Sequence, residues 1–102
     1  MAPIDFSSSG DNVVVADPGD GRYIAIDFIS FFPTTASTVQ FLADARELSG
    51  PLPLDAKQTI TWENAMGNEH GLIKTNPGED FIMNNSSAVQ IGGMVVYRLI
   101  GN

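Results

Sequence analysis

The chain has 102 residues, 43% of them hydrophobic, and 12 acidic residues against 5 lysines and arginines give it a formal net charge of −7. This length corresponds to one domain with a real core, and the lack of cysteine excludes disulfide scaffolds, thiol catalysis and iron–sulfur clusters. Binding to a phosphate backbone requires clustered lysines and arginines. We therefore expect an acidic single-domain protein that does not bind nucleic acid.

The N-terminal segment is polar apart from Ile4 and Phe6 and has no strand pattern. We expect residues 1–11 to form an N-terminal arm and residues 12–102 to form the folded domain. The segment also lacks the basic start and apolar stretch of a secretory signal. Because no apolar run in the sequence approaches the length of a membrane-spanning helix, we expect no membrane association.

Alternating apolar residues and β-branched or aromatic runs predict strands along the rest of the chain. The eight predicted strands are residues 12–16, 23–32, 38–45, 57–62, 72–75, 81–84, 88–91 and 94–100. Turn signals such as Asp17-Pro18-Gly19-Asp20-Gly21 separate them, often at intervals near ten residues, which is typical of a sandwich or barrel. A helix over residues 39–48 is the less favoured alternative, because the segment is short and begins with a β-branched residue.

The predicted strand at residues 23–32 is apolar on both of its alternating faces. Ile26 and Phe28 lie on one face, and Ile29 and Phe31 lie on the other. A half-buried antiparallel strand normally has one polar face. Covering both faces requires a central position in a sheet, a long loop or a neighbouring subunit.

Groups that carry out chemistry are scarce in this sequence. The only imidazole is His70, for which the neighbouring sequence supplies no catalytic partner, so we expect a surface loop residue. The acidic pairs Asp17/Asp20 and Glu79/Asp80 occur in turns, where such residues are common, and the first pair lacks the spacing of a calcium loop. We predict no catalytic residue, no metal site and no cofactor.

Three segments carry a resemblance to a known group of proteins. They are Leu48-Ser49-Gly50-Pro51-Leu52-Pro53-Leu54, Gly71-Leu72-Ile73-Lys74-Thr75-Asn76-Pro77-Gly78-Glu79-Asp80-Phe81 and Ser87-Ala88-Val89-Gln90-Ile91-Gly92-Gly93-Met94-Val95-Val96-Tyr97. In order and spacing they are similar to small structural proteins of tailed bacteriophages, over about residues 12–99. The resemblance implies a single all-β domain, a jelly-roll-like β-sandwich of about eight antiparallel strands.

The resemblance also implies a function without catalysis. Such modules occur as capsid decoration (cement) proteins, often as trimers, and as parts of head or tail fibres. We therefore expect a homotrimer on the outer capsid surface of a virion, bound to the major capsid protein and made in the host cytoplasm. The negative net charge would complement basic patches on the shell. The residues predicted to lie at subunit or shell contacts are Ile4, Phe6, Tyr23, Ile29 and Phe31.

An alternative function is recognition of a host surface glycan by a fibre-associated sandwich. Trp62-Glu63-Asn64 combines an aromatic ring with a carboxylate and an amide, which are the residue types of many carbohydrate sites. An aromatic residue is more often part of a core than of a ligand platform. The glycan hypothesis therefore depends on whether the ring of Trp62 is exposed.

Overall fold

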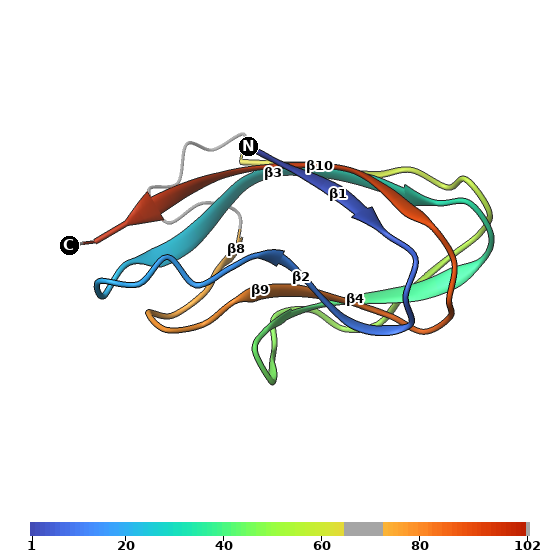
Figure 1. Ribbon diagram of the computed structural model, residues 1–102. Coiled ribbons are helices and arrows are strands. Elements are labelled where there is room, and N and C mark those ends of the chain that lie inside the picture. Colours follow the sequence, from blue (N-terminus) through green and yellow to red (C-terminus); the bar gives the residue numbers. More distant parts are fainter. Residues whose placement is uncertain (65–72, 102) are drawn as a thin grey trace.

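The computed structural model describes residues 1–64 and 73–101, and in this part of the chain every regular element is a strand. Two antiparallel sheets of five strands each pack face to face, as Figure 1 shows edge-on. Sheet A contains β1 (Ala2–Phe6), β10 (Ile91–Ile100), β3 (Tyr23–Pro33), β7 (Ile60–Glu63) and β8 (Ile73–Lys74). Sheet B contains β2 (Gly10–Val15), β9 (Phe81–Asn85), β4 (Ser37–Ala43), β5 (Arg46–Glu47) and β6 (Leu52–Leu54).

The strand order is that of a jelly roll. Sheet A runs β1-β10-β3-β7, with β8 also paired to β3, and sheet B runs β2-β9-β4-β5, with β6 also paired to β4. Since β7 and β8 lie along one edge of β3, and β5 and β6 along one edge of β4, each sheet has four strand positions. The predicted all-β sandwich of about eight antiparallel strands is confirmed. Residues 39–48 form no helix: they contain the end of β4, a turn at residues 44–45 and the strand β5.

The core lies between the two sheets and is centred on aromatic side chains. The ring of Phe41 from sheet B contacts Phe31 of sheet A edge-on, with ring centroids 5.7 Å apart. It also packs against Phe81 at 5.8 Å and against Trp62 at 5.4 Å. Burying each large apolar side chain contributes about 1.5–3 kcal/mol, so this cluster is a main source of the adhesion between the sheets.

A β-bulge at Asp27 interrupts the regular pairing of β3 with β10. Val96 lies opposite Phe28 and the next residue, Tyr97, lies opposite Ile26, so that β3 has one extra residue between the two pairs. Because side chains alternate along a strand, one extra residue reverses which positions face the core. Even-numbered apolar residues before the bulge and odd-numbered ones after it are therefore fully buried, and they are Ile24, Ile26, Ile29 and Phe31.

The bulge explains the apolar pattern on both faces of residues 23–32. In a regular strand Ile26 and Ile29 would face opposite sides, but here both face the same core. The central position of β3 between β10 and the β7/β8 edge satisfies its backbone on both sides. The apolar pattern therefore requires no neighbouring subunit.

The expected N-terminal arm over residues 1–11 is wrong. Residues 2–6 form β1 along β10, with Ile4 opposite Gly93, and β2 begins at Gly10. Ile4 is 2% exposed and belongs to the core. The strand is short and contains Pro3, which has no N–H group and is tolerated at a sheet edge. The segment therefore has no recognisable strand pattern, and β1 could not be predicted from the sequence.

Candidate interaction surface

The five residues predicted to lie at partner contacts do not form one surface. Ile4, Ile29 and Phe31 are at most 2% exposed and are buried inside the single chain, so their prediction as contact residues is wrong. The cause is the bulge for Ile29 and Phe31, and the unrecognised strand β1 for Ile4. Phe6 is half-buried against the core, and Tyr23 is half-buried at the start of β3.

A different set of apolar side chains is exposed on the outer face of sheet A. Met94 and Val96, two residues apart on β10, are 38% and 36% exposed. Phe32 of β3 lies opposite Gly92 and is 39% exposed, and Phe28 lies opposite Val96 and is half-buried. We call Phe28, Phe32, Met94 and Val96 the outer apolar row. It crosses the two longest strands of the molecule and is covered by no other part of the described chain.

Glycine shapes one end of the outer apolar row. A Cβ atom at Gly92 would lie 3.6 Å from Cζ of Phe32, so the ring lies over the backbone of β10. Nearby, a hollow of about 230 Å³ is lined by Met1, Ala2, Pro3, Gly93 and Met94. The row therefore continues across β10 towards β1 as an apolar and partly hollow surface.

An ion pair closes the other end of the row. Arg98, which follows Val96 on the same face of β10, donates from Nε to Oδ2 of Asp27 at 2.6 Å and from Nη2 to Oδ1 at 3.0 Å. The hydrogen bond from Arg98 lowers the pKa of Asp27 below its usual value, and a further bond from Asn64 adds to the effect. The charge of the bulge residue is thus matched by a neighbour on the adjacent strand.

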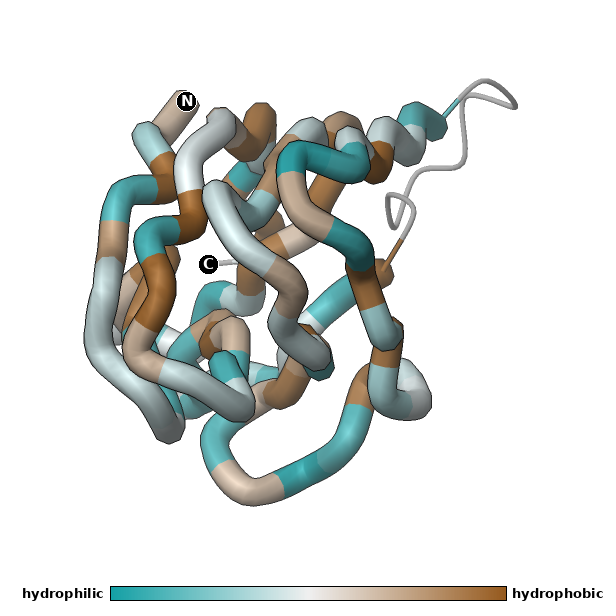
Figure 2. Tube along the Cα trace, turned by 90° about the vertical axis from the view of Figure 1, so that its right-hand side faces the viewer, coloured by the Kyte–Doolittle hydropathy of each residue, from teal (hydrophilic) through white to brown (hydrophobic). Residues whose placement is uncertain are grey.

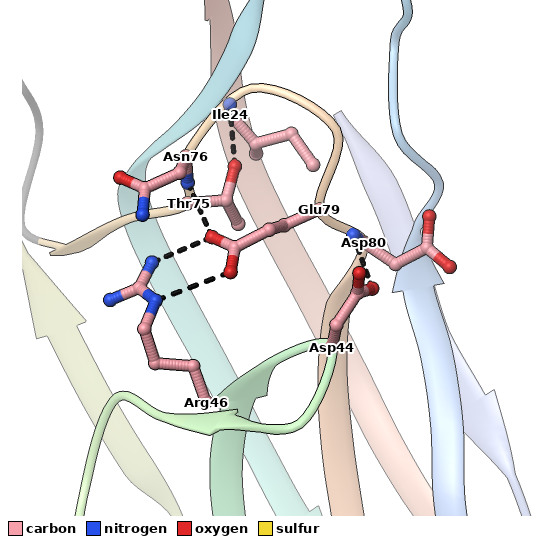
Figure 3. A network of polar contacts seen from close by, with 7 residues as sticks. All are labelled: Ile24, Asp44, Arg46, Thr75, Asn76, Glu79 and Asp80. Carbon is pink, nitrogen blue, oxygen red and sulfur yellow. Dashed lines mark hydrogen bonds and ion pairs between the residues drawn. The ribbon is translucent and has the colours of Figure 1, made fainter.

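The carboxylates of Glu79 and Asp44 form hydrogen bonds within the protein, as Figure 3 shows. The Glu79 carboxylate accepts hydrogen bonds from Nη2 of Arg46 at 2.7 Å and from the backbone N–H of Asn76 at 2.6 Å. The Arg46 bond lowers the pKa of Glu79 below its usual value. Asp44 Oδ1 accepts the backbone N–H of Asp80 at 2.9 Å. These bonds join the β4–β5 turn to the loop between β8 and β9.

The same pattern extends to the loop between β2 and β3. Asp80 Oδ1 accepts the backbone N–H of Asp17 at 2.6 Å, and Asp17 Oδ1 accepts the N–H of Gly19 at 3.0 Å. The two acidic pairs predicted as turn formers therefore include carboxylates that bind main-chain groups of turns. Within residues 1–64 and 73–101, no three acidic or histidine side chains are grouped so as to hold a metal ion. His70 lies outside the described residues.

The ring of Trp62 is directed to the core rather than to the surface. It is half-buried and meets Phe41 in an edge-on contact with an interplanar angle of 77°. Asn64 donates from Nδ2 to Oδ1 of Asp27 at 3.2 Å, which fixes the bulge instead of a ligand. The proposed sugar platform at residues 62–64 is therefore not present in this form.

Within the described residues, no helix has the length and apolar character to cross a bilayer. A search with models of known protein families found no match, and comparisons with curated proteins and with solved structures found none either.

Proposed function

We propose that this chain is a non-enzymatic capsid decoration protein that binds the outer surface of a bacteriophage capsid as a homotrimer, with the outer face of sheet A buried on assembly. The observation that carries the proposal is the outer apolar row of Phe28, Phe32, Met94 and Val96. Three of its members are each more than a third exposed and lie on neighbouring strands of one rigid sheet. Contiguous exposed apolar surface of this kind marks interaction sites.

The distribution of charge supports a contact through this face. The charged side chains that flank the row on β3 and β10 are Asp27 and Arg98, which neutralise each other. Several of the remaining acids gather in the loops at one end of the sandwich, among them Asp17, Asp44 and Asp80. A chain with a net charge of −7 resists self-association, so a locally neutral face is the favourable place for a subunit contact.

The size of the face limits the strength of one contact. Strands β3 and β10 have 11 and 10 residues, so the face is roughly 35 Å long. Four strand positions side by side make it about 15–20 Å wide. This is about 600 Å² in plan, against about 800 Å² per partner in a standard stable interface. A single pair of copies is therefore expected to be weak, and binding to a shell combines several such contacts.

Sedimentation of purified protein over a range of concentrations tests the proposal. We expect a single species of 10.9 kDa at low concentration and a species of three times that mass at high concentration. Met94→Asp together with Val96→Asp should leave the chain folded and abolish the larger species, because both side chains are exposed in the single chain.

The matched control is Val13→Asp, on β2 of the other sheet, where the side chain is 57% exposed. This variant should associate like the unmodified chain. A monomer at every concentration, or an equal loss of association in the control, would show that the outer apolar row is not the subunit contact.

A further inference from the structure

A second surface feature lies at the end of the sandwich remote from the acidic loops. A hollow of about 400 Å³ opens between the start of β4, the strand β6 and the loop that follows β9. Its lining residues are Ala36, Ser37, Thr38, Pro53, Leu54, Asp55, Ser86 and Ser87. The volume falls within the range of sites for small ligands, about 300–1,000 Å³. Loops at the ends of a sandwich are common places for binding sites.

The surroundings of this hollow are rich in hydroxyl groups. Figure 2 faces this end of the molecule, which lies to the right in Figure 1, and pale to teal segments predominate in its loops. The serines and threonines of the loops and strand ends here are Ser7, Ser8, Ser9, Thr34, Thr35, Ser37, Thr38, Ser86 and Ser87. Together they make this end rich in uncharged hydroxyl groups, and Asp55 is the charged residue among those that line the hollow.

Hydrogen bonds inside the protein determine what the inner hydroxyls present to a ligand. Ser37 donates its proton to Oδ1 of Asn85, so its oxygen acts as the acceptor for Ser86 Oγ at 3.3 Å. Ser86 Oγ in turn accepts the backbone N–H of Thr38 at 2.9 Å. A hydroxyl has one proton and two lone pairs. Ser86, which is exposed, therefore keeps one lone pair, and it presents an acceptor to the hollow.

Asp55 and the β6 residues complete the lining. The backbone N–H of Asp55 donates to Oε1 of Gln58 at 2.9 Å, which fixes the turn while the side chain remains exposed. The exposed ring of Pro53 supplies an apolar wall, and Leu54 beside it is buried in the core. Among the described residues that line the hollow, none is a lysine or arginine. The lining thus offers acceptors and a carboxylate beside an apolar wall, and it repels anions.

We propose that this hollow binds a neutral monosaccharide unit of a glycan. Sugar hydroxyls donate to a carboxylate and to hydroxyl acceptors, and the C–H face of a pyranose ring packs on an apolar wall. No residue of the outer apolar row lines the hollow, and its strand residues belong to β4 and β6 of sheet B, so the protein can carry a sugar while sheet A is buried on assembly. The carboxylate of Asp55 and the acceptor at Ser86 bind the ring hydroxyls, and Pro53 contacts its apolar face. The shallow site and its few contacts correspond to a Kd of about 1–10 mM.

Titration of the isotopically labelled full chain with methyl glycosides of glucose, galactose and mannose, followed by amide NMR shifts, tests this proposal. We expect saturable shifts for at least one glycoside at the amides of Thr38, Asp55, Ser86 and Ser87, with no change along β10. Asp55→Ala should weaken binding about tenfold, the effect of losing one hydrogen bond to a charged group. Thr38→Val keeps the side-chain shape, removes a hydroxyl from the lining and should weaken binding several-fold.

The matched control is Glu47→Ala, which removes an exposed carboxylate from β5 and should leave binding unchanged. Glucuronate should bind at least tenfold more weakly than methyl glucoside, because Asp55 repels its carboxylate. The proposal is wrong if no glycoside gives saturable shifts up to about 100 mM, a concentration well above the expected Kd. It is also wrong if Asp55→Ala and Glu47→Ala behave alike or if glucuronate binds as well as the neutral sugars.

Discussion

The two adjacent glycines of β10 should respond very differently to substitution by alanine: we expect a large loss of stability at Gly93 and little change at Gly92. A Cβ atom at Gly93 would lie 2.0 Å from the carbonyl oxygen of Ser30 and 2.7 Å from Cα of Phe31. Both are backbone atoms of the central strand β3, so no side chain can turn aside to make room. At Gly92 the nearest atom to an added Cβ is Cζ of Phe32 at 3.6 Å, an ordinary contact.

The cost of Gly93→Ala follows from this geometry. Relief of the clash requires β10 and β3 to separate by roughly 1.5 Å, since carbon atoms in contact prefer about 3.5–4.0 Å. Overpacking of a core costs about 1–3 kcal/mol, and forcing an unfavourable backbone conformation costs a similar amount. We therefore expect a loss of about 2–6 kcal/mol for Gly93→Ala, a large part of the 5–15 kcal/mol that stabilises a typical domain.

Urea unfolding followed by tryptophan fluorescence measures both variants. Gly92→Ala should change the free energy of unfolding by less than about 1 kcal/mol, because the methyl group fits and the unfolded chain loses entropy. Gly93→Ala should lower the free energy of unfolding by about 2–6 kcal/mol, and the urea concentration at the midpoint should fall accordingly. Equal stability of the two variants would contradict the register of β10 on β3 and the close approach at Ser30.

Three further predictions concern the bulge, the ion pairs and the core. Asp27→Ala should destabilise the fold by about 1–3 kcal/mol, because Arg98 and Asn64 then lose the group they bind at the bulge. A matched Asp55→Ala change at an exposed position after β6 should cost less in the same urea assay. The pKa values of Asp27 and Glu79 are lowered in the folded chain. The stability that the two carboxylates add to the fold is therefore complete above the unfolded pKa values of about 4 and is lost as the pH falls through the folded values. The free energy of unfolding measured from pH 7 to pH 2 should show this decline, and a variant with Asp27→Asn and Glu79→Gln should show a flatter one. Trp62→Ala should lower the free energy of unfolding by about 2–4 kcal/mol through the lost contact with Phe41; circular dichroism follows this unfolding, because the variant removes the one tryptophan of the sequence. The substitution should leave glycoside titration of the folded protein unchanged, and loss of sugar binding without loss of stability would show that Trp62 binds the ligand.

Strand positions were predictable from sequence where alternation and turn residues agree. The turn at Asp17-Pro18-Gly19-Asp20-Gly21 and the runs that became β3, β4 and β9 all appear in the expected order. The prediction of separate strands at residues 88–91 and 94–100 was wrong, because β10 is one strand that runs through Gly92 and Gly93. The strands β1, β5 and β6 were missed, since they have five, two and three residues and hold few side chains with strand preference. Short edge strands are stabilised by their neighbours, and local sequence does not show those neighbours.

The surface of the protein was harder to predict than its strands. The bulge at Asp27 depends on Arg98 and Asn64, which are distant in the sequence, and it moves Ile29 and Phe31 from a presumed outer face into the core. A run of ten residues without a proline or glycine gave no local sign of it. The alternation of Met94, Val96 and Arg98 on β10 was visible, but only the pairing with β3 shows that Phe32 and Phe28 join them. The hydroxyl-lined hollow depends on three segments that meet only in the fold.

An electron-microscopy map of the virus particle that carries this chain tests the central claim most directly. The account predicts sandwich-shaped density in groups of three on the outer capsid surface, with the face formed by β3 and β10 turned towards a neighbouring copy or the shell. Density along a fibre or tail, or a sandwich on the capsid with the outer apolar row facing solvent, would contradict it.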